Sequence, residues 1–107
     1  MTISEIDVDE LAELLASGAS LVDVREHDEW REVRVPGVPL VPLQTVPDNI
    51  DVFSVSQPVY IICRSGARSM RAAQYLESQG VEAVNVAGGT NAWIESGRNV
   101  ESGPAGE

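Results

Sequence analysis

The only cysteine of the chain, Cys63, stands where an expected strand meets an expected helix. It follows an apolar, β-branched run over 59–62, which is typical of a buried strand. A turn from Cys63 to Arg68 then leads into a helical pattern over 69–79. The backbone N–H groups of such a turn, the positive end of a helix dipole and nearby arginines all favour a thiolate over a thiol. The spacing therefore predicts a loop that presents a nucleophilic sulfur anion.

The turn after Cys63 also supplies what an anion needs for binding. Its successive backbone N–H groups can form an anion cradle, and Gly66 permits the tight bend. Arg64 is the candidate for contact with an anionic substrate, because a guanidinium can form two hydrogen bonds to an oxyanion. We therefore expect Cys63 to be catalytic and the substrate to be bound by Arg64, Ser65, Gly66, Ala67 and Arg68.

A loop of this kind needs support from neighbouring elements. Arg68 closes the turn, and we expect it to pair inward with a carboxylate such as Asp23 or Glu26. Asp23 and Arg25 lie at the end of another expected strand, and parallel strands gather functional groups at their carboxyl ends. Asp23, Arg25 and Ser69 are therefore candidate supporting residues. Asp23 could instead only end its strand or cap the next turn.

Segments with strand and helix patterns alternate along the chain, and prolines interrupt regular structure within 36–47. The patterns predict strands over 3–6, 21–24, 38–41, 59–62 and 83–86, and helices over 8–16, 26–32, 69–79 and 90–95. This alternation predicts an α/β domain with a central, mostly parallel sheet of about five strands and helices on both faces. We assign residues 1–98 to this domain and 99–107, rich in glycine, serine and glutamate, to a disordered tail.

Composition narrows the classes of partner and environment. The 107 residues include 17 acidic and 7 basic side chains and carry a formal charge of −10, which disfavours nucleic acid and anionic membrane surfaces as partners. The acidic start lacks the pattern of a signal peptide, and no apolar run approaches the ~20 residues of a membrane span. One cysteine allows no intrachain disulfide and suits a reducing compartment. We expect a cytoplasmic monomer with no metal and no organic cofactor.

The segment Cys-Arg-Ser-Gly-Ala-Arg-Ser at 63–69 resembles the active loop of single-domain rhodaneses, sulfurtransferases that carry a persulfide on the loop cysteine. Other parts of the family pattern recur in the family's order: Leu-Val-Asp-Val-Arg-Glu at 21–26, Val-Pro-Gly-Val at 35–38, and a Gly-Gly…Trp motif within 85–93. The loop and these motifs together are far more specific than any one of them alone. The resemblance covers 3–98, nearly the whole chain.

This resemblance implies a rhodanese-like fold, in which Asp23 and Arg25 lie near the loop, and a sulfurtransferase activity. Cys63 would attack the outer sulfur of a sulfane donor such as thiosulfate and hold that sulfur as a persulfide. Because the chain has no second cysteine, the sulfur must pass to an external acceptor, which is expected to be a thiol, cyanide or a sulfur-accepting protein.

Two other functions fit parts of the pattern. A phosphatase or arsenate reductase of the related cell-cycle phosphatase type has five residues between its cysteine and arginine, whereas four separate Cys63 from Arg68. The shorter loop encloses a smaller space, which argues against a phosphoryl substrate. A non-enzymatic or slow sulfur-sensing and protein-binding module would keep the same fold as a docking surface. The family often has a histidine where this chain has Arg34. Because of this difference, the resemblance does not identify the sulfur donor.

Overall fold

Four parallel strands form the single sheet of the computed structural model, which describes residues 2–104. In spatial order they are β1 (Ser4–Ile6), β4 (Ala83–Val86), β3 (Val59–Ile62) and β2 (Ser20–Asp23). Every residue of β3 and β4 is buried, as expected for central strands of a parallel sheet covered on both faces. The carboxyl ends of β2 and β3 are in register, since Asp23 is opposite Ile62.

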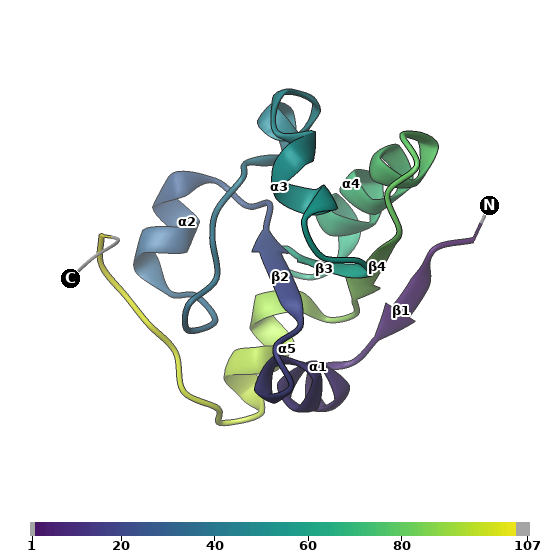
Figure 1. The fold of residues 1–107 in the computed structure, drawn as a ribbon. Coiled ribbons are helices and arrows are strands. Elements are labelled where there is room, and N and C mark those ends of the chain that lie inside the picture. Colours follow the sequence, from purple (N-terminus) through teal and green to yellow (C-terminus); the bar gives the residue numbers. More distant parts are fainter. Residues whose placement is uncertain (1, 105–107) are drawn as a thin grey trace.

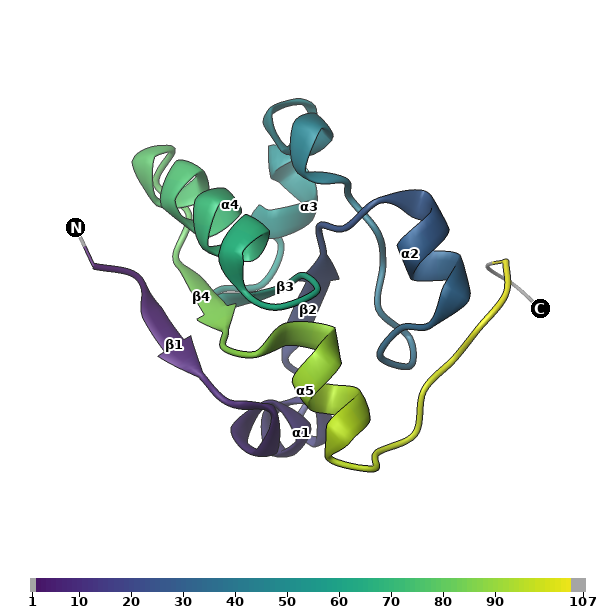
Figure 2. The same ribbon diagram turned by 180° about the vertical axis from the view of Figure 1, so that it is seen from behind.

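Helices cover both faces of the sheet (Figures 1 and 2). They are α1 (Val8–Ala16), α2 (His27–Glu32), a 3₁₀ helix over Leu43–Asp48, α3 (Ile50–Ser54), α4 (Ala67–Ser78) and α5 (Gly89–Glu95). One apolar cluster joins the sheet to α3 and α4, and a second joins it to α1, α2 and α5. In Figure 2, α3 and α4 lie above the sheet and α1 and α5 below it. The expected α/β architecture is therefore confirmed.

The alternation of side chains along β3 decides where the cysteine points. Val59 and Ile61 face the cluster that contains α4, whereas Tyr60 and Ile62 face the opposite cluster. Cys63 continues the alternation and belongs with Val59 and Ile61. Its side chain is therefore directed toward the helix that follows it.

The prediction of about five strands was wrong by one, because the stretch 38–41 forms no strand. Among residues 2–104, this stretch contributes only an isolated bridge between Leu40 and Asp23. Pro39 and Pro42 flank Leu40 and have no N–H group to donate to a neighbouring strand. Beyond the prolines, the chain instead forms the short 3₁₀ helix and α3, where Phe53 is fully buried against the sheet.

The end of the described chain lies beside α2, although a disordered tail is predicted over 99–107. Glu101 and Arg34 exchange two backbone hydrogen bonds, both 2.9 Å long. The N–H of Gly103 donates to the carbonyl of Arg31, and the Arg34 guanidinium donates to the carbonyl of Gly103. Figure 1 shows this segment running from α5 to α2. Residues 105–107 lie outside the described part of the chain.

The helices between residues 2 and 104 are all too short or too polar to cross a membrane.

Candidate active site

Cys63 lies directly after β3 and is 1% exposed. Its Sγ accepts hydrogen bonds from the backbone N–H of Gly66 at 3.1 Å and from the hydroxyl of Ser69 at 3.2 Å. Gly66 precedes α4 and Ser69 is in its first turn, so both donors are fixed by the way the helix begins. Of the backbone N–H groups predicted to form a cradle, that of Gly66 contacts the sulfur directly, and the second direct donor is the Ser69 side chain.

These contacts change the acidity of the thiol. Burial raises the pKa of Cys63, because it disfavours the charged form. Hydrogen bonds from the Ser69 hydroxyl, and from the backbone N–H groups of Ser69, Gly66 and Ser65, act in the opposite direction and outweigh burial. The net result is a pKa below the ordinary value of a cysteine thiol. A lower pKa increases the fraction of nucleophilic thiolate at neutral pH.

Gly66 has the backbone conformation that the tight loop requires. Its φ is +115°, in the region that side chains other than glycine rarely adopt. This conformation turns its N–H toward Sγ while its carbonyl accepts from the Met70 N–H of α4. The loop residues Arg64, Ser65 and Ala67 are exposed.

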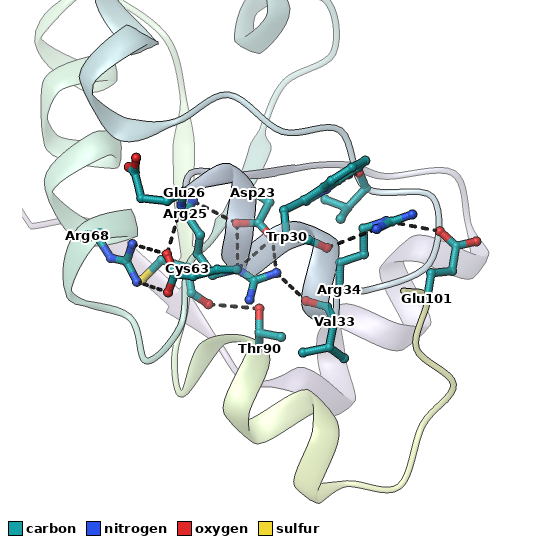
Figure 3. Close-up of polar contacts among 12 residues, drawn as sticks. Asp23, Arg25, Glu26, Trp30, Val33, Arg34, Cys63, Arg68, Thr90 and Glu101 are labelled. Carbon is teal, nitrogen blue, oxygen red and sulfur yellow. Dashed lines mark hydrogen bonds and ion pairs between the residues drawn. The ribbon is translucent and has the colours of Figure 1, made fainter. Parts of the chain in front are cut away.

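The start of α5 holds the loop from the other side. The N–H groups of Thr90 and Asn91 donate to the carbonyls of Cys63 and Arg64 at 2.8 and 3.1 Å, and the Thr90 hydroxyl also donates to the Cys63 carbonyl (Figure 3). A Cβ atom on Gly89 would lie 2.4 Å from the Cys63 carbonyl oxygen, so only glycine allows this approach. The sequence analysis placed Gly89 in the Gly-Gly…Trp motif but did not predict its close approach to the Cys63 carbonyl.

Arg68 turns toward α2 and pairs with Glu29. Two of its nitrogens contact the two Glu29 carboxylate oxygens at 2.7 and 2.8 Å. The expected inward pairing with a carboxylate is present, but the predicted partners Asp23 and Glu26 were wrong. Glu26 caps α2 in a reciprocal capping box with Glu29, and one turn of helix brings Glu29 to Arg68. The hydrogen bond from Arg68 holds the pKa of Glu29 at about 2, below the ordinary 4.5.

Asp23 and Arg25 form a buried ion pair at the end of β2. Asp23 is 0% exposed and Arg25 is 3% exposed, and the guanidinium contacts the carboxylate at 2.8 Å. The same guanidinium donates to the carbonyl of Val33 at 2.7 Å. This pair therefore ties the end of β2 to the segment after α2 (Figure 3). Both residues lie beside the loop in the fold, as the family pattern implied.

A cavity of about 180 Å³ opens beside the loop and is lined in part by Arg25, Glu29, Arg64, Thr90 and Ile94. Arg25 is already paired with Asp23, and Glu29 is paired with Arg68. Arg64 is exposed and is the loop arginine that borders this space.

Arg34 has a structural setting away from this cavity. It is 5% exposed, its guanidinium lies 3.8 Å from the centre of the Trp30 ring, and it donates to the carbonyls of Trp30 and Gly103. Its Nε atom is 3.6 Å from the Glu101 carboxylate. The residue that replaces the family's common histidine is thus committed to α2 and the end of the described chain.

The sequence placed Asn85 at the start of the Gly-Gly…Trp motif but indicated no role for its side chain at the site. This residue of β4 is 1% exposed, and its side chain contacts Ser69, Gly66 and Glu5. A polar amide within the buried run Ala-Val-Asn-Val was the available signal, because a buried amide must find hydrogen-bond partners.

Between residues 2 and 104, no three histidine, cysteine, aspartate or glutamate side chains gather to hold a metal ion.

Comparison with known proteins agrees with this geometry. The model of the rhodanese-like domain matches residues 7–96. The chain belongs to the rhodanese-like family. It is 36% identical over 95 residues to a putative sulfurtransferase, YtwF, of Bacillus subtilis, with 87% of this chain and 92% of that protein covered. It is 31% identical over 104 residues to the thiosulfate sulfurtransferase GlpE of Glaesserella parasuis, with 95% and 96% covered.

A solved structure shares the fold of this rhodanese-like chain. The crystal structure of a rhodanese-like domain protein from Staphylococcus aureus superposes with a TM-score of 0.79 at 39% identity. The match covers 85% of this chain and 91% of that one. The relatives named as sulfurtransferases place this chain among sulfurtransferase-like rhodaneses.

Proposed function

We propose that this protein is a sulfurtransferase that carries a sulfane sulfur on Cys63 as a persulfide. The observation that supports this most strongly is the buried Sγ with two hydrogen-bond donors and a lowered thiol pKa. A buried thiolate without such donors would be disfavoured. The hydrogen-bond donors of the loop stabilise an anionic sulfur, and a persulfide ends in an anionic sulfur.

The first half-reaction begins from the Cys63 thiolate. With thiosulfate as donor, Sγ attacks the outer sulfur and a new S–S bond forms. The bond between that sulfur and the central sulfur breaks, and sulfite leaves with its electron pair. The enzyme is left with Cys63–S–S⁻. The loop N–H groups that favour the thiolate also suit the terminal sulfur anion of this product.

Arg64 is the proposed contact for the donor. It is exposed, borders the cavity beside the loop, and carries a charge suited to the oxyanion end of thiosulfate. Arg68 is instead committed to Glu29 and keeps the loop in shape. Ser65 and Gly66 contribute backbone N–H groups to the sulfur, and Ala67 is proposed to contact the donor in the same way.

The second half-reaction needs an acceptor from outside the chain. A thiolate or cyanide attacks the outer sulfur of the persulfide, takes it, and returns the electron pair of the S–S bond to Sγ. The only cysteine of the chain is Cys63, so no internal thiol can take the sulfur. The acceptor is a small thiol, cyanide or a sulfur-accepting protein, and a reducing compartment such as the cytoplasm would keep Cys63 ready to react.

Steady-state kinetics test this proposal. Thiocyanate formation from thiosulfate and cyanide should show the parallel-line pattern of ping-pong exchange, and Cys63→Ser should abolish it, because a hydroxyl is a far weaker nucleophile at neutral pH. Arg71→Ala, which removes an exposed arginine of α4, is the control and should keep the wild-type rate. Undiminished transfer in Cys63→Ser would reject Cys63 as the sulfur carrier.

A further inference from the structure

Asn85 is a buried amide that lies beneath the active loop. It belongs to β4, the strand between β1 and β3 in the sheet, and is 1% exposed. Its Nδ2 donates to the Glu5 carboxylate at 2.8 Å and to the Gly66 carbonyl at 3.2 Å. Its Oδ1 faces the Ser69 hydroxyl, which donates to it. The amide thereby connects the edge strand β1 to two residues that contact the sulfur.

The neighbours of Asn85 allow only one orientation of its amide. The Glu5 carboxylate and the Gly66 carbonyl are both acceptors, so the NH₂ group must face them. A flipped amide would place its oxygen against two other oxygens and lose both hydrogen bonds. Oδ1 is therefore held against Ser69.

The Ser69 hydroxyl has a single proton and more than one acceptor within reach. Asn85 Oδ1 and Cys63 Sγ both lie at hydrogen-bond distance from its oxygen. When Cys63 is a thiol, the hydroxyl can donate to Asn85 and accept from the S–H group. When Cys63 is a thiolate, the same proton can turn to the sulfur. Asn85 keeps the hydroxyl oxygen in the one place from which both bonds can be made.

We propose that Asn85 is a positioning residue for the Cys63 sulfur, acting from under the loop through Ser69 and Gly66. This inference deepens the proposed function and rests on it for its biological meaning. Asn85 itself touches neither sulfur nor substrate. It contacts two residues that donate to Sγ: its oxygen accepts from the Ser69 hydroxyl, and its nitrogen donates to the Gly66 carbonyl.

The charged groups around this network come from several elements. Glu5 approaches from β1, Arg68 from the start of α4 and Glu29 from α2, where it is paired with Arg68. The buried Asp23–Arg25 pair lies at the end of β2. Replacement of Asn85 by a neutral residue leaves all of these charges in place, so a changed thiol titration can be assigned to the lost hydrogen bonds.

The test is the rate of Cys63 alkylation by iodoacetamide as a function of pH, in wild type and Asn85→Ala. We expect the profile of the variant to move to higher pH and the rate at neutral pH to fall about tenfold, the effect of one charge-assisted hydrogen bond. Val84→Ala is the matched control: it truncates the preceding residue of β4 toward the opposite face. It should leave the profile unchanged even where it lowers stability.

A profile of Asn85→Ala that superposes on wild type would overturn the proposal and leave Asn85 a packing residue. If Asn85→Ala does not fold, Glu5→Gln and Glu5→Ala replace it, because Glu5 is exposed. Both remove the same charge, but glutamine keeps an oxygen that can accept from Asn85 Nδ2. We expect the alanine profile to lie at higher pH than the glutamine profile, and coincident profiles would overturn the proposal.

Alkylation needs no sulfur donor, which separates this inference from the proposed function. Persulfide loading from thiosulfate is measured in parallel by intact mass. A shifted alkylation profile in a protein that never loads sulfur would reject the sulfurtransferase and keep the positioning role. If wild type loads sulfur but the alkylation profile of Asn85→Ala is unshifted, the sulfurtransferase is kept and the positioning role is rejected.

Discussion

Two groups of polar residues lie near Cys63 and affect it in different ways. The inner group, Ser69, Asn85 and Glu5, lies beneath the loop, and Ser69 bonds directly to Sγ. The outer group consists of two ion pairs, Arg68 with Glu29 and Arg25 with Asp23, and Arg25 also donates to the backbone carbonyl of Val33. The direct hydrogen bonds to the sulfur therefore come from neutral donors, while the charged side chains are paired with each other and fix the loop and its wall. The charge of Arg68 also interacts with the Cys63 thiolate.

This division has a physical reason. A cation in contact with the thiolate would stabilise it strongly and also weaken it as a nucleophile, since nucleophilicity falls as the pKa of a thiol falls. Hydrogen bonds from a hydroxyl and a backbone N–H lower the pKa of Cys63 more gently. The placement of Arg68 on Glu29 leaves the sulfur available for reaction.

The largest expected effect comes from the inner group. Ser69→Ala removes the hydroxyl that donates to Sγ, so the pKa of the Cys63 thiol should rise and alkylation at neutral pH should slow by about tenfold or more. Ser65→Ala is the matched control, because Ser65 lies in the same loop with an exposed side chain. Equal rates for Ser69→Ala and wild type would mean that the hydroxyl does not act on the sulfur.

A smaller and more selective effect is expected on the outer side. Arg64→Ala should raise the KM for thiosulfate by about tenfold, because it removes a charge-assisted contact to an oxyanion. The KM for a neutral organic trisulfide as donor should change little in Arg64→Ala. Arg71→Ala should behave as wild type with both donors. If both donors are affected equally, Arg64 does not bind the anionic end of the donor.

The smallest effect is expected on stability. The pKa of Glu29 is lowered from 4.5 to about 2, so its pair with Arg68 stabilises the fold fully above about pH 4.5 and loses this contribution as the pH falls toward 2. The difference in unfolding free energy between wild type and Glu29→Gln should be at most ~1 kcal/mol at neutral pH, as for other partly exposed ion pairs. This difference should shrink as the pH falls from 4.5 toward 2.

Chemical denaturation at several pH values measures this difference. Glu32→Gln, an exposed glutamate of the same helix, is the control and should show no such narrowing. A stability difference that stays constant between pH 7 and pH 3 would show that the Glu29 pair does not contribute through its charge.

Local patterns in the sequence were sufficient for the elements that carry the loop. The helix α1 covers the predicted range 8–16 and begins after Asp7, whose side chain accepts from the Glu10 N–H. The strand β3 has the predicted bounds, and Cys63 follows it directly. These features depend on residues close in sequence, so propensity and capping determine them.

The features that the sequence did not reveal depend on tertiary placement. Asn85 meets Ser69 and Glu5 only because β4 lies between β1 and β3, a strand order that no local pattern states. The choice of Glu29 over Glu26 by Arg68 depends on how α2 is rotated against the loop. The stretch 38–41 forms no fifth strand because Pro39 and Pro42 cannot donate backbone hydrogen bonds to a neighbouring strand. The sequence prediction treated these prolines as interruptions of regular structure but did not exclude a strand between them.

Intact mass of the protein after incubation with thiosulfate, and again after cyanide, tests the central claim most directly. We predict that wild type gains one sulfur atom, that cyanide removes it, and that Cys63→Ser gains none. A folded wild-type protein with an alkylatable Cys63 that gains no sulfur from thiosulfate or a polysulfide would contradict the account and favour a protein-binding module on the same fold.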